Sequence, residues 1–309
     1  MTTPPLRGVY AAVVTPLQAD GQLDLETLPR LLTFLRRRGC HGALLLGTTG
    51  EGPSFAVNER RALLQAATAA RQAIPDFRLL AGVGTPSLEE TIHLTRMAFD
   101  LGLDGVVALP PYYYRKVTDE GLFLWFQTLI RRAVPADGAL LGYHIPAVSG
   151  VPLSLNLIAR LKAEFPTQFA GLKDSSGDPE HARQLGELFG RDLRVFSGND
   201  RLFSLALGYQ ASGCITAMAN LYSPDLRRVW DTFQAGESAP AAQQRLEHAR
   251  QVFDRYPPAP ALLKALLAQG FDFPHWSARP PLVDLPDGLA SQVLAELTNL
   301  APIPDRALA

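Results

Sequence analysis

The chain has 309 residues, of which 47% are hydrophobic and 19% charged, with a formal net charge of -1. This composition is typical of a globular protein with a sizeable core, and without a basic run nucleic acid is not an expected partner. No apolar run approaches the roughly 20 residues that cross a bilayer, and the first ten residues lack signal-peptide features. We therefore expect a cytoplasmic protein that does not bind membranes, with Cys40 and Cys214 as reduced thiols.

Eight short apolar runs recur along most of the chain. They are Gly8–Leu17, His41–Gly47, Arg78–Gly84, Gly105–Pro111, Ala139–Ile145, Phe169–Ser175, Arg194–Asp200 and Gly213–Asn220. Near-continuous apolar runs of about four to eight residues are typical of strands buried on both faces of a parallel sheet.

The segments between these runs have the apolar spacing of helices. In the first segment one helical face carries five leucines, Leu25, Leu28, Leu31, Leu32 and Leu35. Helix start signals follow at Ser87 with Glu90, at Asp178 before Pro179, and at Ser223 before Pro224. Eight such alternations predict an α/β fold, the (β/α)8 TIM barrel. A doubly wound sheet is the alternative, but the first strand runs into Thr15-Pro16 without a nucleotide-type glycine fingerprint.

The strand pattern ends after about Asp231. Helical stretches near 240–255, 259–269 and 287–299 are separated by proline-rich joints. We predict a catalytic barrel over residues 1–230 and a C-terminal helical extension over residues 231–309 that packs on the barrel.

Barrel enzymes carry their reactive residues at the C-terminal ends of the strands. Those ends hold hydroxyls, phenols and one amine in the segments Gly47–Gly52, Tyr112–Tyr114, Tyr143–Pro146, Lys173–Ser176 and Ser197–Asp200. Lys173 lies in an apolar run, where burial lowers a lysine pKa and frees the amine to form an imine with a ketone. A lysine paired with Asp174 or reaching solvent is an equally open alternative. Lys116 in a loop, and Lys162 and Lys264 in predicted helices, are poorer candidates.

The segment Gly47–Gly52 joins a strand to a helix. Its glycines allow successive backbone N–H groups to point at one anion, and Thr48 and Thr49 add donors. Because no Gly-Lys-Ser/Thr follows, a carboxylate suits it better than a nucleotide phosphate, and an ordinary glycine-rich turn is the alternative. Tyr143 should bury its ring and can turn its hydroxyl to the mouth, with a plain core tyrosine as the alternative.

In this order the motifs resemble those of the dihydrodipicolinate synthase / N-acetylneuraminate lyase family. GTTGE follows the second strand, PYY the fourth, Y-x-x-P the fifth and GxKD the sixth. The resemblance covers roughly residues 6–230, and the helical tail more loosely. It implies a class I pyruvate-dependent lyase or aldolase that works through a Schiff base, a chemistry that needs no cofactor or metal.

The resemblance implies a role for each matching residue. Lys173 would form the Schiff base with pyruvate, and Tyr143 would carry protons to and from the imine and the substrate oxygen. In the loop that starts at Gly47, Thr48 and Thr49 would hold the pyruvate carboxylate. Thr48 would also relay protons to Tyr143.

Two further matches concern the surroundings of the site. Tyr113 matches a tyrosine that this family lends across a tight dimer interface, so the resemblance implies a homotetramer built as a dimer of dimers. Ile215, at the end of the eighth strand, matches a position whose backbone carbonyl faces the lysine. No His, Cys or Asp cluster with metal-ligand spacing is present in the sequence.

The sequence departs from the lysine-pathway synthases, which usually carry an arginine two residues after the proline of the strand-five motif. Val148 stands there, and losing a bidentate carboxylate clamp is not a conservative change, although Arg115 or Arg201 could substitute. The strings IPAVSGV and KDSSGD are closer to the sialic acid lyases and 2-keto-3-deoxy sugar acid aldolases. On that side Ser175 and Asp200 match positions that hydrogen-bond the polyol chain.

Two other positions also depart from the pattern. Arg201 replaces a glutamate common in sialic acid lyases, which argues against N-acetylneuraminate and suggests a second anionic group on the substrate, unless this arginine is only solvated. His144 replaces an asparagine after the tyrosine, and we expect a packed imidazole, with proton transfer as the alternative.

The leading hypothesis is a lyase that reversibly cleaves a 2-oxo acid, either a 2-keto-3-deoxy sugar acid or a sialic-acid-like substrate, to pyruvate and an aldehyde. One alternative is 4-hydroxy-tetrahydrodipicolinate synthase, which condenses pyruvate with aspartate semialdehyde. Another is a Schiff-base dehydratase of a keto-deoxy sugar acid. The last is a non-catalytic 2-oxo acid binder, against which the joint presence of lysine, tyrosine and threonine argues.

Overall fold

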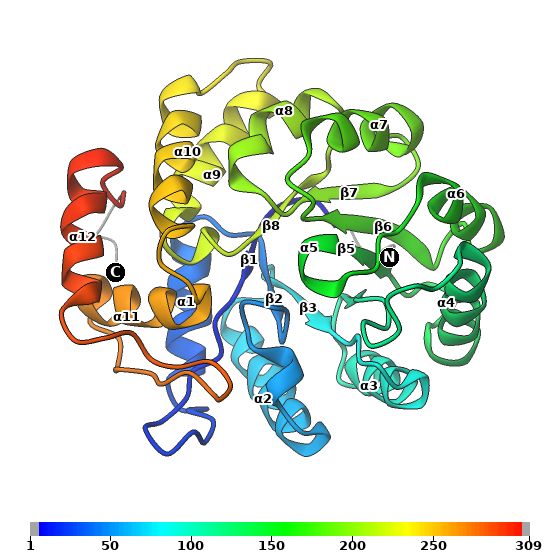
Figure 1. Ribbon diagram of the computed structural model, residues 1–309, viewed down its shortest axis with the longest axis horizontal. Helices are drawn as coiled ribbons and strands as arrows, with labels where there is room; N and C mark the ends of the chain where they lie inside the picture. Colours follow the sequence, from blue (N-terminus) through cyan, green and yellow to red (C-terminus); the bar gives the residue numbers. More distant parts are fainter. Residues whose placement is uncertain (1–5, 305–309) are drawn as a thin grey trace.

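The computed structural model describes residues 6–304 and contains a closed barrel of eight parallel strands (Figure 1). Each strand pairs with the next, and β8 returns to β1. The strands are β1 (Gly8–Ala12), β2 (Gly42–Leu45), β3 (Arg78–Gly82), β4 (Gly105–Ala108), β5 (Leu140–His144), β6 (Phe169–Asp174), β7 (Arg194–Ser197) and β8 (Gly213–Thr216). Each predicted apolar run contains one of them, so the predicted (β/α)8 barrel is confirmed.

Helices surround the barrel (Figure 1). They are α1 (Leu28–Arg37), α2 (Val57–Ala70), α3 (Leu88–Asp100), α4 (Asp119–Ala133), α6 (Leu155–Glu164), α7 (Pro179–Phe189), α8 (Phe203–Gly208) and α9 (Ala219–Gln234). A short helix α5 (Pro146–Ser149) and the 3-10 turns η1 (Gly52–Ser54), η2 (Arg71–Ala73) and η3 (Asp200–Leu202) lie in the connections. The leucines of α1 are fully buried as predicted, whereas Leu25 precedes the helix and is half-buried.

Two of the three predicted helix starts are confirmed. The Ser87 hydroxyl accepts the Glu90 N–H at 3.3 Å, and Asp178 caps α7 with Pro179 as its first residue. The third signal, at Ser223-Pro224, lies inside α9, where Tyr222 has non-helical dihedral angles. Proline cannot donate the N–H that a continuous helix needs, so this signal marks a kink and not the start of the helix.

Strand register determines which side chains face the barrel interior. Tyr143 pairs with Lys173, and His144 pairs with Asp174, across β5 and β6. Successive strand side chains point to opposite faces, so the first pair faces the interior and the second pair faces the helices. The interior is filled by an apolar set, Tyr10, Leu44, Leu80, Val107, Leu141, Phe196 and Ile215, with Tyr143 among them.

The C-terminal segment forms α10 (Pro240–Phe253), α11 (Ala259–Phe271) and α12 (Leu289–Leu300), as the predicted helical stretches required. They lie together on one side of the barrel beside α1 and α9 (Figure 1), and their apolar side chains join the same core as those of the barrel helices. The division of the chain at residue 230 stays a prediction. Within residues 6–304, no helix combines the length and apolar character needed to cross a membrane.

Candidate active site

Lys173 and Tyr143 meet inside the barrel. Lys173 is only 3% exposed, and its Nζ lies 4.2 Å from the centre of the Tyr143 ring. Tyr143 is itself buried among the apolar side chains of the interior. The structure therefore brings together the amine and the phenol that the sequence analysis selected, in a site from which most water is excluded.

The hydroxyl of Tyr143 joins a chain of polar groups. It lies 3.4 Å from the Thr48 hydroxyl. Burial alone would raise the pKa of Tyr143. The charge of Lys173 and hydrogen bonds with Thr48, Lys173 and Ser175 outweigh burial and hold that pKa below its usual value. A phenol with a lowered pKa exchanges its proton more readily near neutral pH, as a general acid and base must.

Close backbone packing shapes the loop Gly47–Gly52. The Glu51 N–H donates to the Thr48 carbonyl and the Gly52 N–H to the Gly47 carbonyl, both at 3.1 Å. A Cβ at Gly52 would collide with the carbonyl of Leu46, so only glycine allows this approach. Thr49 is buried in the loop, while Thr48 turns toward Tyr143.

Of the other predicted site residues, Ser175 lies near Tyr143, whereas Asp200 is engaged by other side chains. Ser175 lies beside the Tyr143 hydroxyl, and Ile215 is fully buried in the barrel interior. Asp200 is also fully buried, where its carboxylate accepts hydrogen bonds from the Thr216 hydroxyl and from Arg250. Contact between Asp200 and a substrate stays a prediction, and it would require one of these partners to give way.

Tyr113 does not join this group within the single chain. Its side chain is 75% exposed, and its ring packs edge to face on Tyr114 at a centroid distance of 5.2 Å. The role expected of Tyr113 in the active site of another subunit stays a prediction. An exposed pair of aromatic rings is compatible with it.

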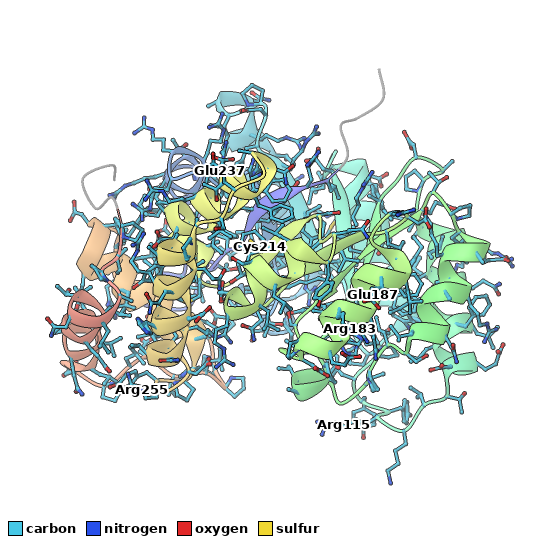
Figure 2. All side chains as sticks on the ribbon, turned by 90° about the horizontal axis from the view of Figure 1, so that it is seen from above. Arg115, Arg183, Glu187, Cys214, Glu237 and Arg255 are labelled. Carbon is cyan, nitrogen blue, oxygen red and sulfur yellow. The ribbon has the colours of Figure 1, made fainter. Side chains whose placement is uncertain are left out.

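The loops after β4 and β5 contact each other. Val148, at the position of the missing arginine, is 56% exposed on α5. Arg115 packs its aliphatic stem over Gly150, so closely that a Cβ there would lie 2.7 Å from the Arg115 Cδ. Figure 2 shows Arg115 at the periphery of the molecule. Arg201 is also exposed, on the turn η3.

Arg60 is a charged group that the sequence analysis missed. It is buried on α2, where its Nε donates to the Phe55 carbonyl at 3.1 Å, and it lines the same cavity as Thr48 and Tyr143. Burial lowers its pKa, against the opposing charges of Glu90 and Tyr112. The run Asn58-Glu59-Arg60-Arg61 resembles an ordinary solvated helix start, and only the three-dimensional structure separates Arg60 from its neighbours.

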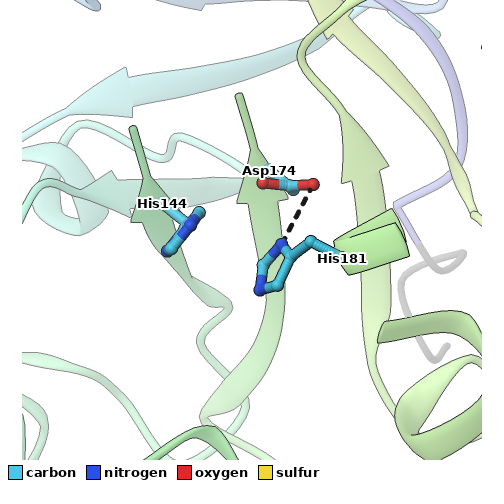
Figure 3. Close-up of side chains that lie close together, drawn as sticks. All are labelled: His144, Asp174 and His181. Carbon is cyan, nitrogen blue, oxygen red and sulfur yellow. Dashed lines mark ion pairs between the residues drawn. The ribbon is translucent and has the colours of Figure 1, made fainter. Parts of the chain in front are cut away.

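On the outer side of the barrel wall from Lys173 and Tyr143, the side chains of His144, Asp174 and His181 cluster (Figure 3). The two imidazole rings stack at 4.5 Å, and His181 Nδ1 lies 3.4 Å from Asp174 Oδ2. Their potential ligand atoms lie within 4.8 Å of one another, although the three residues come from β5, β6 and α7 and show no ligand spacing in the sequence.

The hydrogen bonds of this cluster do not fit a metal ion. His144 Nδ1 accepts the Leu153 N–H at 3.0 Å, and burial lowers the pKa of His144 to about 4, so the ring is neutral with its proton on Nε2. Asp174 already accepts hydrogen bonds from the N–H and hydroxyl of Ser176. Only His181 and Asp174 could offer lone pairs, fewer than the three or four protein ligands of a typical zinc site. His144 is thus a packed, hydrogen-bonded imidazole.

Comparison with known proteins identifies the family. Residues 5–300 match the model of the Dihydrodipicolinate synthetase family. An uncharacterized DapA-like lyase of Chloroflexus aurantiacus is 42% identical over 280 residues, covering 90% of this chain and 92% of that protein. The 4-hydroxy-tetrahydrodipicolinate synthase 2 of Halalkalibacterium halodurans is 31% identical and covers 85% of this chain and 88% of its own length.

Solved structures agree with these sequence relatives. Dihydrodipicolinate synthase from Agrobacterium tumefaciens superposes with a TM-score of 0.86 at 30% identity, over 96% of this chain and 99% of that one. YagE, a prophage protein from E. coli K12 solved in complex with pyruvate, superposes with a TM-score of 0.89 at 25% identity, over 96% and 98% of the two chains. The resemblance noted from the motifs is confirmed: this chain belongs to the dihydrodipicolinate synthetase family of class I pyruvate-dependent lyases and aldolases.

Proposed function

We propose that this enzyme cleaves a 2-oxo acid, of the 2-keto-3-deoxy sugar acid or sialic-acid-like class, to pyruvate and an aldehyde through a Schiff base on Lys173. The observation that carries the proposal is the placement of the Lys173 Nζ, buried in the barrel and 4.2 Å from the Tyr143 ring. Thr48 and Thr49 would bind the carboxylate of the substrate, and Tyr143 would handle its protons.

The reaction proceeds through one covalent intermediate on this lysine. The neutral Nζ attacks the C2 ketone, and the carbinolamine oxygen leaves as water with the phenolic proton of Tyr143, which gives an iminium and the Tyr143 phenolate. The C3–C4 bond then breaks, and its electron pair neutralises the iminium to an enamine. The C4 hydroxyl proton passes to the Tyr143 phenolate, so that the aldehyde leaves uncharged. Tyr143 returns that proton to C3, and hydrolysis of the iminium releases pyruvate and free Lys173.

The lowered pKa of Tyr143 supports this assignment. A positive charge at Lys173 stabilises the phenolate, and the iminium carries its positive charge at the same nitrogen. The phenolate is therefore favoured at the stage of the reaction that needs a base. The Thr48 hydroxyl, 3.4 Å away, connects the phenol to the loop at the mouth.

The exposed Val148 favours a polyol substrate over an aldehyde with its own carboxylate. No fork of guanidinium donors is available at that position on α5 to bind a second carboxylate. Ser175, whose hydroxyl lies beside Tyr143, can instead bind a substrate hydroxyl.

A second candidate is the condensation of pyruvate with aspartate semialdehyde. The stem of Arg115 lies over Gly150, at the end of the loop that carries Val148, so a cation from the loop after β4 is available near the usual position. The name of the Halalkalibacterium halodurans relative points the same way.

Borohydride trapping tests the Schiff base. Reduction in the presence of pyruvate should attach one pyruvate-derived group to the peptide that contains Lys173, and Lys173→Met should abolish the adduct. A non-catalytic binder would give no adduct with the wild type. Release of pyruvate from a panel of 2-keto-3-deoxy acids then separates the two candidates. Turnover of aspartate semialdehyde with pyruvate at higher kcat/KM than any sugar acid would reject the lyase.

A further inference from the structure

A buried ion pair joins the loop Gly47–Gly52 to the C-terminal helices. The side chains of Glu51 and Lys264 are both fully buried, and the Lys264 ammonium pairs with Glu51 Oε1. Lys264 Nζ also donates to the Ser277 carbonyl at 2.8 Å, and Glu51 Oε2 accepts the Arg279 N–H at 2.8 Å. Both carboxylate oxygens of Glu51 are thus held by the clamp, which we define as Lys264, Ser277 and Arg279.

Arg279 of the clamp also contacts residues that follow the loop Gly47–Gly52. The Arg279 guanidinium donates to the Ser54 carbonyl at 3.2 Å and pairs with Glu59 at 2.8 Å. It also lies over the ring of Phe55, 4.4 Å from the centroid. One short C-terminal segment therefore fixes the connection from β2 to α2 on both sides of η1.

Stability alone is a poor explanation for this ion pair. Removing two charges from water costs about as much as their attraction returns, and a buried apolar pair often stabilises a fold as well or better. The ion pair instead fixes the backbone conformation of Glu51. Glu51 has a left-handed φ of 55°, which is unfavourable for a side chain of this kind, and the two-sided grip on its carboxylate offsets that preference.

The fixed conformation of Glu51 also determines the positions of Thr48 and Thr49. The Glu51 N–H donates to the carbonyl of Thr48, and the Thr48 hydroxyl lies 3.4 Å from that of Tyr143. Thr49 lies between Thr48 and the glycine that precedes Glu51. A shift of the Glu51 side chain would turn the backbone that presents both hydroxyls.

We propose that Glu51 and Lys264 are positioning residues for the carboxylate of the 2-oxo acid, so that the C-terminal helices set the geometry of substrate capture. This inference rests on the proposed function, because it assigns the same threonines to the same carboxylate. It extends that function by making α11 part of the binding apparatus, although Lys264 itself never touches the substrate.

The test measures borohydride trapping on Lys173 against pyruvate concentration. Lys264→Met and the charge-free double variant Glu51→Gln/Lys264→Met should raise the half-saturating pyruvate concentration about tenfold or more, while trapping at saturation stays near the wild-type level. Asp225→Asn is the matched control, because it breaks a buried carboxylate pair with Arg245 between α9 and α10 and should leave half-saturation unchanged. Melting temperatures of all variants separate loss of folding from loss of positioning.

Each outcome of the titration has one meaning. If the wild type gives no adduct, the proposed function fails. If the wild type is trapped and a folded variant keeps wild-type half-saturation, the ion pair is only structural and the inference fails. Lys264→Met leaves Glu51 charged and unpaired, so if it does not fold the double variant decides.

A measurement on the wild type alone provides a second test. Coupling is reciprocal: if breaking the clamp weakens pyruvate binding tenfold, saturating pyruvate must make opening of the clamp about tenfold rarer. Hydrogen exchange of peptides covering residues 264–279 should slow by that factor once pyruvate is bound. Slower exchange in residues 46–55 with no change in 264–279 would overturn the inference, whatever the variants do.

Discussion

Replacing Tyr143 by phenylalanine removes the proposed proton carrier and little else. The ring is buried among the apolar side chains of the barrel interior, and phenylalanine fills the same space. The loss in stability is that of the hydroxyl, which lies 3.4 Å from the Thr48 hydroxyl, and a hydrogen bond of this kind contributes about 0.5–1.5 kcal/mol. The loss in catalysis should be far larger, because general acid and base catalysis contributes about 10²–10⁴-fold.

That range corresponds to about 3–5 kcal/mol of activation free energy at roughly 1.4 kcal/mol per tenfold change in rate. Pyruvate release from the best 2-oxo acid substrate gives kcat and kcat/KM, and denaturant unfolding gives the stability of the same preparation. Tyr10→Phe is the matched control. Tyr10 is a second buried tyrosine of the barrel interior, and its ring packs on Phe196 at a centroid distance of 5.5 Å. Loss of the Tyr10 hydroxyl should change kcat less than about twofold. A Tyr143→Phe enzyme with kcat within threefold of the wild type would refute the assignment of this phenol.

Three further changes test other parts of the site. Thr48→Val keeps the shape of the side chain but removes the hydroxyl 3.4 Å from Tyr143, so kcat should fall about tenfold or more. Because the Tyr143 phenolate loses a stabilising donor, its pKa should rise and the basic limb of the pH–rate profile should move to higher pH. Tyr113→Phe should lower kcat about tenfold if this exposed tyrosine completes the site of a neighbouring subunit, and full activity in a preparation shown by light scattering to be oligomeric would contradict that arrangement. His144 should make stability depend on pH, because its pKa is about 4 in the folded protein and about 6.5 in the unfolded chain. Its contribution to the free energy of unfolding is complete above pH 6.5, and about 2–3 kcal/mol is lost as the pH falls toward 4. His144→Asn should flatten this part of the curve of stability against pH.

The barrel was predictable from the sequence because it follows from local pattern. Strand alternation has a period of two, so a lysine and a tyrosine in register on neighbouring strands must face the same side. The eight apolar runs therefore predicted the fold and placed Lys173 and Tyr143 at the same end of the barrel, and the structure adds the register in which they pair. In the GTTGEG loop, Gly50 and Gly52 lie so close to the carbonyls of Val13 and Leu46 that a Cβ would collide with them, while binding of a carboxylate by this loop stays a prediction.

Contacts between distant segments were not predictable in this way. His181 reaches Asp174 from α7, and Arg250 reaches Asp200 from α10. In both cases the partner lies on a helix whose charged residues look like a solvated face. Arg60 illustrates the same difficulty, because its burial depends on how α2 packs over the loop before it.

The burial of Lys264, by contrast, is indicated by the sequence around it. It was set aside as a Schiff-base candidate because it lies in a helix, where a lysine normally faces water. The surrounding string APALLKALLAQGF contains only one other polar side chain, Gln269, and an apolar helix of this kind is largely buried. A single ammonium in such a helix must find a buried anion, and Glu51 is that anion. An isolated lysine in an otherwise apolar helix therefore indicates a buried ion pair, as with Glu51, and not a solvated side chain.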